Sequence, residues 1–145
     1  MTEIRYPDVP AHLLEVGASF EQTYTPVLDF RGWRVAMLRH SEANDPAHFQ
    51  QVERHNETNE VFILTAGQAD LVICDDDDGQ PVSPTVFPMQ HNVAYNIQQS
   101  VWHNVVMTPD AHIILFERTD TTVENSNYAK LSADVVAGIC EPFSI

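Results

Sequence analysis

Short apolar runs recur along the chain, each bounded by polar, proline or glycine residues, and they restrict the fold more than any other feature. Five runs of three or four residues are rich in β-branched and aromatic side chains: 35–38, 61–64, 71–74, 105–107 and 113–116. Helices of this length are not stable in isolation, whereas buried strands of this length are common. The pattern therefore predicts an all-β fold.

The segments between and beyond the runs predict a hairpin and two short terminal helices. Residues 75–81 read Asp-Asp-Asp-Asp-Gly-Gln-Pro, and the Asp-Gly step favours a tight turn. A calcium loop would need ligands at alternate positions and a distal bidentate carboxylate, so a solvated hairpin tip is favoured. One helical turn is expected over residues 11–15, and a short helix over residues 133–137, between an N-cap at Ser132 and a stop at Gly138.

Length and charge limit the class of protein. A chain of 145 residues, 43% of them hydrophobic, can build one sizeable core, so a single domain over residues 1–145 is expected. A formal net charge of -14 opposes binding to nucleic acid and to anionic membrane surfaces. Cys74 and Cys140 give no disulfide framework, residues 1–10 carry neither a basic start nor an apolar stretch, and no apolar window approaches the length that crosses a bilayer. We therefore expect a cytoplasmic protein.

Imidazole and carboxylate side chains gather between two predicted strands and recur beside a third. If residues 51–55 are extended, Glu53 and His55 point to one face, because side chains alternate along a strand. Glu60 opens the next apolar run, where a carboxylate is costly unless it is paired, hydrogen-bonded or metal-bound. With His103 from a distant run, His55 and Glu60 give two imidazoles and a carboxylate and leave coordination positions open, which is typical of catalytic metal sites.

Each of these residues also has an ordinary structural explanation. His55 and Glu60 can form an ion pair at a strand end, and His103 can be a core histidine that hydrogen-bonds the backbone. Glu53 can be a fourth ligand or a group that supports a ligand. The remaining histidines have no partner at comparable spacing and are expected to be structural or solvated: His12, His40, His48, His91 and His112.

The spacing resembles that of the cupins, small β-barrel proteins defined by two sequence motifs. The first motif contains His-x-His, three or four residues, glutamate, six residues and glycine. His55, Glu60 and Gly67 match its second half, whereas its first histidine falls on Glu53. Of the second motif only His103 and its distance are kept, within a Val-Trp-His-Asn phrase that is often seen in cupins.

This resemblance implies a double-stranded β-helix, the cupin jelly-roll barrel, with its core over about residues 33–117. It also implies a divalent metal held by the residues at the four matching positions, Glu53, His55, Glu60 and His103. Glutamate in place of the first histidine favours harder ions such as manganese or iron(II) over zinc. Zinc and nickel are the other candidates, and some cupins hold no metal at all.

Three classes of function are consistent with the site. The favoured one is a metal-dependent oxygenase, isomerase or lyase acting on a small polar molecule in the barrel mouth, with Glu53 or Glu57 moving a proton. A metal-independent sugar or nucleotide-sugar isomerase or epimerase would instead use His55 and His103 as acid and base, although few Arg and Lys residues are present to hold a pyrophosphate. The third class is a non-catalytic module that binds a small ligand.

The pocket lining and the assembly are further expectations. We expect the substrate pocket to be lined by Tyr95, Trp102 and Phe62, although aromatic residues more often pack in the core. Small cupins often pair through sheet edges or exchange N-terminal strands, and residues 23–30 are the expected arm. We therefore predict a homodimer.

Overall fold

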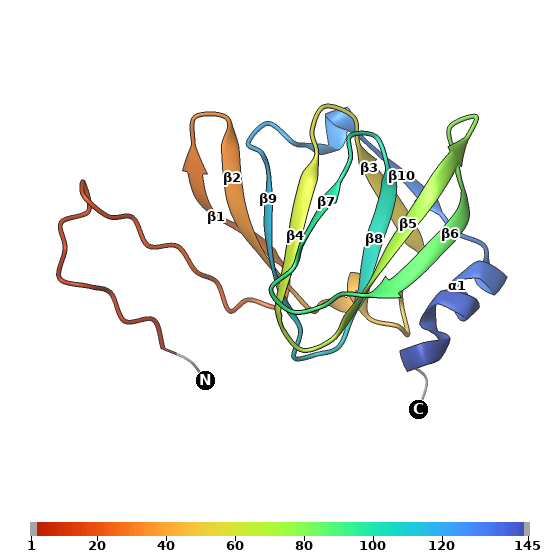
Figure 1. The fold of residues 1–145 in the computed structure, drawn as a ribbon, viewed down its shortest axis with the longest axis horizontal. Helices are drawn as coiled ribbons and strands as arrows, with labels where there is room; N and C mark the ends of the chain where they lie inside the picture. The colour runs from red at the N-terminus through yellow and green to blue at the C-terminus, as the bar shows by residue number, and fades with distance from the viewer. Residues whose placement is uncertain (1–2, 144–145) are drawn as a thin grey trace.

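Ten strands and one short α-helix make up the computed structural model of this protein, which describes residues 3–143 (Figure 1). The strands are β1 (Tyr24–Phe30), β2 (Trp33–Arg39), β3 (Gln51–His55), β4 (Glu60–Ala66), β5 (Ala69–Asp77), β6 (Gln80–Pro88), β7 (Ala94–Ile97), β8 (Trp102–Met107), β9 (His112–Arg118) and β10 (Ser126–Lys130). The helix is α1 (Ala133–Cys140), and the 3-10 turns are η1 (Glu42–Asn44), η2 (Val123–Asn125) and η3 (Glu141–Phe143). All five apolar runs lie within strands, which confirms the all-β prediction.

The strands form two five-stranded sheets. Their orders are β1-β2-β9-β4-β7 and β10-β3-β8-β5-β6, and neighbouring strands in both sheets are antiparallel. Apart from the β1–β2 and β5–β6 hairpins, consecutive strands alternate between the two sheets, so that neighbours within a sheet, such as β2 and β9, are distant in sequence, as in a jelly roll. This is the predicted cupin-type barrel.

Alternation along the strands divides the apolar side chains between two cores. One core lies between the sheets and includes Leu64, Val105 and Leu115. The other lies between the second sheet and α1, and includes Trp102 and Ile139. Strand β8 contributes to both cores because successive side chains point to opposite faces. Polar residues at the inward positions of β3, β4 and β8 therefore meet inside the barrel.

The hairpin between β5 and β6 turns at Asp78 and Gly79, whose φ angles are 49° and 81°. Two consecutive positive φ angles define a type I′ turn, which fits the twist of the flanking strands. Asp77 pairs with Gln80 across the turn. The predicted hairpin is confirmed, and the first three aspartates of residues 75–78 extend β5.

The terminal helices are only partly as predicted. The side chain of Ser132 accepts a hydrogen bond from the backbone N–H of Val135, so the N-cap of α1 is confirmed. The helix continues past the predicted stop at Gly138 and ends at Cys140. Its last turn is buried against the second sheet, and this packing outweighs the helix-breaking tendency of glycine. Near the other end, residues 11–15 contain the single turn that was predicted, and it closes on the carbonyl of Pro10.

Residues 23–30, the segment predicted to be an exchanged arm, include β1, which pairs with β2 of the same chain at the edge of the first sheet. The extended arm precedes it and runs from residue 3 to residue 23, away from the barrel (Figure 1). No helix of the described residues is long and apolar enough to cross a membrane.

Candidate metal centre

Four side chains converge where the two sheets face each other. Glu53, His55, Glu60 and His103 each offer a donor atom, and these atoms all lie within 4.8 Å of one another. The Nε2 atom of His55 is 3.1 Å from Glu60 Oε2 and 3.8 Å from Glu53 Oε1, and Nε2 of His103 is 3.5 Å from Glu60 Oε1. The structure thus brings together all four predicted ligands.

The strand registers explain this convergence. Glu53 and His55 lie two positions apart on β3, and Glu53 is directly opposite His103 on β8. Glu60 is the first residue of β4, in the other sheet, and shares the inward face of that strand with Phe62. The cluster therefore bridges the two sheets, with the apolar interior on one side.

His103 has one ring nitrogen committed to the backbone. Its Nδ1 atom lies 2.9 Å from the carbonyl oxygen of Val101, which can only accept, so Nδ1 carries the hydrogen. In the neutral ring Nε2 is then a bare lone pair. Among the described residues, Nε2 is the buried side-chain nitrogen or oxygen that lacks a hydrogen-bond partner, and it faces the Glu60 carboxylate. An atom of this kind is suited to bind a cation.

His55 is oriented in the same way by a side chain instead of the backbone. Ser126, its cross-strand partner on β10, donates its only hydrogen to the carbonyl of Thr122, at 2.7 Å. The Ser126 oxygen can therefore only accept from Nδ1 of His55, at 2.8 Å. Nε2 of His55 consequently points its lone pair at Glu60 and Glu53.

This donor set fits a divalent metal. Two lone pairs and two carboxylates repel one another unless protons or a cation lie between them. Ligands at about 2.1 Å from one ion, at tetrahedral or octahedral angles, are about 3.0–3.4 Å apart. The His55–Glu60 and His103–Glu60 separations, 3.1 and 3.5 Å, are close to this range, and the His55–Glu53 separation, 3.8 Å, is longer. Glu53, His55, Glu60 and His103 would hold the ion.

The electrostatics of the cluster favour positive charge at its centre. Burial disfavours charge on both imidazoles, but the nearby Glu60 carboxylate outweighs it and raises the pKa of His55 and of His103. Burial also opposes ionisation of Glu60, yet the two imidazoles hold its pKa far below the usual range. Burial raises the pKa of Glu53. A divalent cation would take the place of the imidazole protons.

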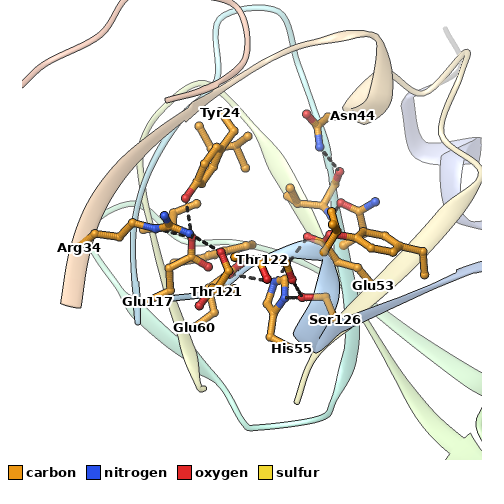
Figure 2. A pocket seen from close by; sticks show the side chains of 17 residues that line it. Tyr24, Arg34, Asn44, Glu53, His55, Glu60, Glu117, Thr121, Thr122 and Ser126 are labelled. Carbon is orange, nitrogen blue, oxygen red and sulfur yellow. Dashed lines mark hydrogen bonds and ion pairs between the residues drawn. The ribbon is translucent and has the colours of Figure 1, made fainter. Parts of the chain in front are cut away.

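A cavity of about 390 Å³ opens onto Glu53, His55 and Glu60 (Figure 2). Its wall carries a second polar group, in which Glu117 accepts hydrogen bonds from Tyr24 (2.5 Å) and from Nε of Arg34 (3.1 Å). Burial, followed by the hydrogen bond and charge of Glu60, raises the pKa of Glu117 to about 7. The cavity thus has a metal-type cluster on one side and an arginine–tyrosine–carboxyl group on the other.

Sequence reasoning missed this second group and Ser126. Arg34 and Glu117 are direct partners across β2 and β9, and each flanks an apolar run. The opposite charges of Arg34, before the run 35–38, and Glu117, after the run 113–116, could have indicated an ion pair. The sequence does not show, however, that these two runs pair with each other. Tyr24 and Ser126 carried no signal in the spacing of the motifs.

Among the predicted pocket residues, Phe62 lines the cavity. Trp102 faces the opposite side of its sheet, packs in the core beneath α1 and donates to Asp76, since it precedes the inward-facing His103. Tyr95 lines a separate apolar cavity between the sheets. Glu57, the second candidate for proton transfer, is exposed in the loop before β4 and accepts from Asn125.

The histidines without a spacing partner also lie apart from the cluster. His40 and His48 contact Asp45, His91 contacts the carbonyl of Gly67, and His112 contacts Met37. His12 is exposed in the N-terminal arm.

Ser126→Ala is expected to weaken metal binding by about 10–100-fold, the usual effect of removing a group that orients a ligand. The loss follows because Nδ1 of His55 would have no acceptor and the ring could reorient. Isothermal titration calorimetry with manganese and zinc measures the effect. Ser126→Thr keeps the hydroxyl and should retain most of the affinity, and Ser132→Ala, at the N-cap of α1, should leave it unchanged. Equal affinities for wild type and Ser126→Ala would contradict the role of Ser126.

The fold and the cluster together define a small cupin domain. A Shewanella frigidimarina protein containing a cupin-2 domain is similar in structure, with a TM-score of 0.50 and 18% identity, over 68% of this chain and 84% of that one. The structure of a Streptomyces PAC13 variant with uridine gives a TM-score of 0.55 at 9% identity, over 93% of this chain and 97% of that one. At these identities the two structures support the fold alone.

Sequence comparison narrows the class to a family. The family model described as ureidoglycolate lyase matches residues 13–136. The chain therefore belongs to the ureidoglycolate lyase family. Ureidoglycolate lyase 2 of Rhizobium meliloti (strain 1021) is 33% identical over 76 residues, which cover 52% of this chain and 46% of that protein. The match thus spans about half the length of that relative.

Proposed function

We propose that this protein is a metal-dependent lyase that cleaves ureidoglycolate, or a closely similar hydroxy acid bearing a ureido group. The observation that carries the proposal is the four-donor cluster at the cavity, found in a chain of the ureidoglycolate lyase family. The cavity volume of about 390 Å³ falls within the range of about 300–1,000 Å³ that is usual for small-molecule sites. A bound divalent ion would act as a Lewis acid that stabilises the oxygen on which negative charge develops.

The polar groups of the cavity suit such a substrate. Ureidoglycolate carries a carboxylate, a hydroxyl and a ureido group on one carbon. Arg34 provides a guanidinium at the wall, held in place by Glu117 and by the carbonyl of Thr121. Guanidinium groups recognise carboxylates through parallel N–H donors. We assign Arg34 to the substrate carboxylate, with Tyr24 beside it.

The reaction requires one proton to leave the substrate and one to return. The hydroxyl loses its proton, its oxygen forms the C=O bond of glyoxylate, the C–N bond breaks, and the released nitrogen takes up a proton to give urea. No redox partner is required. The chain must therefore supply a group that can accept the hydroxyl proton within reach of the substrate.

Glu53 is assigned this role because it is the most accessible member of the cluster. Its side chain is 33% exposed, compared with 5% for Glu60 and 2% for His103. Glu60 lies between the two imidazoles and is committed to them. In this assignment His55, Glu60 and His103 keep the ion in place when Glu53 takes up the proton.

The test is an assay of glyoxylate and urea release from ureidoglycolate, with elemental analysis of protein purified without a metal-leaching affinity tag. We expect about one divalent ion per chain and a loss of turnover on chelation that manganese, iron(II), zinc or nickel restores. Full turnover by metal-free protein would refute the metal-dependent mechanism. Metal at one ion per chain with no cleavage of any ureido acid would refute the lyase.

Two matched variants separate proton transfer from metal retention. Glu53→Gln should lower kcat by about 100-fold or more while at least half of the metal remains bound. Glu57→Gln, at the exposed carboxylate in the loop before β4, should retain both metal and turnover. The assignment of Glu53 fails if Glu53→Gln is fully active.

A further inference from the structure

One buried amide side chain lines the cavity without belonging to the metal-type cluster or to the arginine–tyrosine–carboxyl group. Asn44 is only 7% exposed, and it lies on the side of the cavity opposite Arg34 (Figure 2). It is the last residue of η1, in the connection between β2 and β3. A polar side chain buried to this degree is costly unless its donors and acceptors find partners. The partners of Asn44 therefore bear on what the cavity can bind.

Two contacts fix the orientation of the Asn44 amide. Its Nδ2 atom donates to the carbonyl oxygen of Val105 at 3.3 Å, and its Oδ1 atom accepts from the hydroxyl of Ser41 at 3.1 Å. Because the Val105 carbonyl can only accept, the nitrogen of the amide must face it. A primary amide has two N–H donors and two acceptor lone pairs. Among the described residues, one donor and one acceptor of Asn44 are therefore left for a ligand.

The other neutral polar side chains in the inner part of the cavity are committed to the backbone. Asn104, the second amide of the lining, is less deeply buried and replaces bonds of the sheet. Its Nδ2 donates to the carbonyl of Gln51 at 2.7 Å, and its Oδ1 accepts from the next backbone N–H at 2.8 Å. The hydroxyls of Ser126 and Thr121 donate their only hydrogens to backbone carbonyls. Asn44 differs from them because it projects into the cavity from a loop outside the sheets.

The arrangement of the cavity gives its two sides different partners. Arg34 and Glu117 lie on one side and Asn44 on the other, with His55 and Glu60 between them in the view of Figure 2. A guanidinium suits a carboxylate. A small acid whose carboxylate lies at Arg34 would therefore cross the cluster and present its far end to Asn44.

The unused donor and acceptor of Asn44 define the chemistry of that far end. A second carboxylate has no hydrogen to give and would leave Oδ1 without a donor, and an alkyl group would satisfy neither atom. A ureido group carries both a carbonyl oxygen and N–H donors. Hydrogen bonds made away from water are stronger than exposed ones, and a group left unpaired there is correspondingly costly.

We propose that Asn44 determines specificity for the ureido group of the substrate. Its Nδ2 atom donates to the ureido carbonyl, and its Oδ1 atom accepts from the terminal amino group, while the carboxylate lies at Arg34. The inference rests on the proposed function for the identity of the acid. It adds the residue that distinguishes a ureido acid from the corresponding N-acyl acid, in which a methyl group replaces the terminal amino group.

The test compares the binding of two small acids that this reaction cannot cleave. N-Carbamoylglycine has the carboxylate and the ureido group of ureidoglycolate but lacks its hydroxyl, and N-acetylglycine carries a methyl group in place of the terminal amino group. Isothermal titration calorimetry on the full chain measures both affinities. Wild type should bind N-carbamoylglycine about tenfold more tightly than N-acetylglycine or better, whereas Asn44→Ala should bind the two acids within about twofold of each other.

Two further variants make the comparison specific. Asn44→Leu preserves the volume of the side chain and should also abolish the preference, without the void that alanine leaves. Asn127→Ala, at an exposed amide on β10, is the matched control and should keep the wild-type ratio. A fraction of unfolded protein would lower the binding stoichiometry and leave the ratio of the two affinities unchanged, so the ratio reports on the site.

The outcomes distinguish this inference from the lyase. Wild type that binds both acids equally, or neither of them, would overturn the role of Asn44, and so would a preference that persists in Asn44→Ala. If ureidoglycolate is cleaved in any of these cases, the lyase stands and the inference alone fails. If the expected ratios are found and ureidoglycolate is not cleaved, the lyase fails and Asn44 remains the group that recognises a ureido acid.

Discussion

His103→Ala should yield a folded protein that no longer retains a divalent metal and no longer turns over substrate. The side chain supplies the one buried nitrogen without a partner among the described residues, and its Nδ1 bond to Val101 keeps that nitrogen aimed at Glu60. Removal of one of the two imidazole ligands leaves His55 as the single nitrogen donor beside two carboxylates, which weakens the preference of the site for transition metals. Removing a group that only orients a ligand usually lowers metal affinity by about 10–100-fold. Because His103 would bind the metal directly, we expect a loss of about 100-fold or more.

Elemental analysis after dialysis against buffer is the measurement, with thermal unfolding as the check on folding. His48→Ala is the matched control, because His48 is exposed and contacts only Glu42 and Asp45 among the described ion pairs. It should retain one ion. If His103→Ala and His48→Ala retain the same amount of metal, His103 is not a metal ligand and the assignment of the site is wrong. Since loss of a buried ring also leaves a void, Glu60→Gln offers a second test at nearly constant volume.

The part of the site that was predictable is the part encoded by local alternation. Glu53 and His55 are two positions apart, and Glu60 begins a run whose inward face continues into Phe62, so their common direction follows from strand geometry alone. His103 precedes an apolar run and is inward for the same reason. That these four side chains lie together could be predicted only from the resemblance to cupins, because local sequence does not indicate which strands face each other.

The unpredicted part depends on pairings between distant strands. Arg34 meets Glu117 only because β2 lies beside β9, and Ser126 meets His55 only because β10 lies beside β3. Neither pairing is signalled by the residues concerned. The same limit applies to Trp102, which we expected in the pocket. Neighbouring positions on β8 face opposite ways, so the orientation that brings His103 into the site sends Trp102 to the core under α1.

Gly67→Ala should be one of the most destabilising single-methyl changes available in this chain, and Gly79→Ala isolates the reason. Both glycines have positive φ, 69° and 81°, so alanine at either position is strained by about 1–2 kcal/mol. At Gly79 nothing lies within 4 Å of the added Cβ. At Gly67 the Cβ would lie 2.5 Å from both the backbone N and the Cα of Ala111, atoms that cannot move without shifting the start of β9.

We therefore expect Gly79→Ala to lower the free energy of unfolding by about 1–2 kcal/mol. Gly67→Ala should lower it by about 4 kcal/mol or more, because backbone strain is combined with overpacking. Urea denaturation of the metal-free proteins measures the two free energies of unfolding without a contribution from metal binding. Equal losses would mean that backbone conformation alone explains the glycine in the first cupin motif. A larger loss at Gly67 would show that the motif glycine is required by the close approach of the β4–β5 turn to the residues before β9.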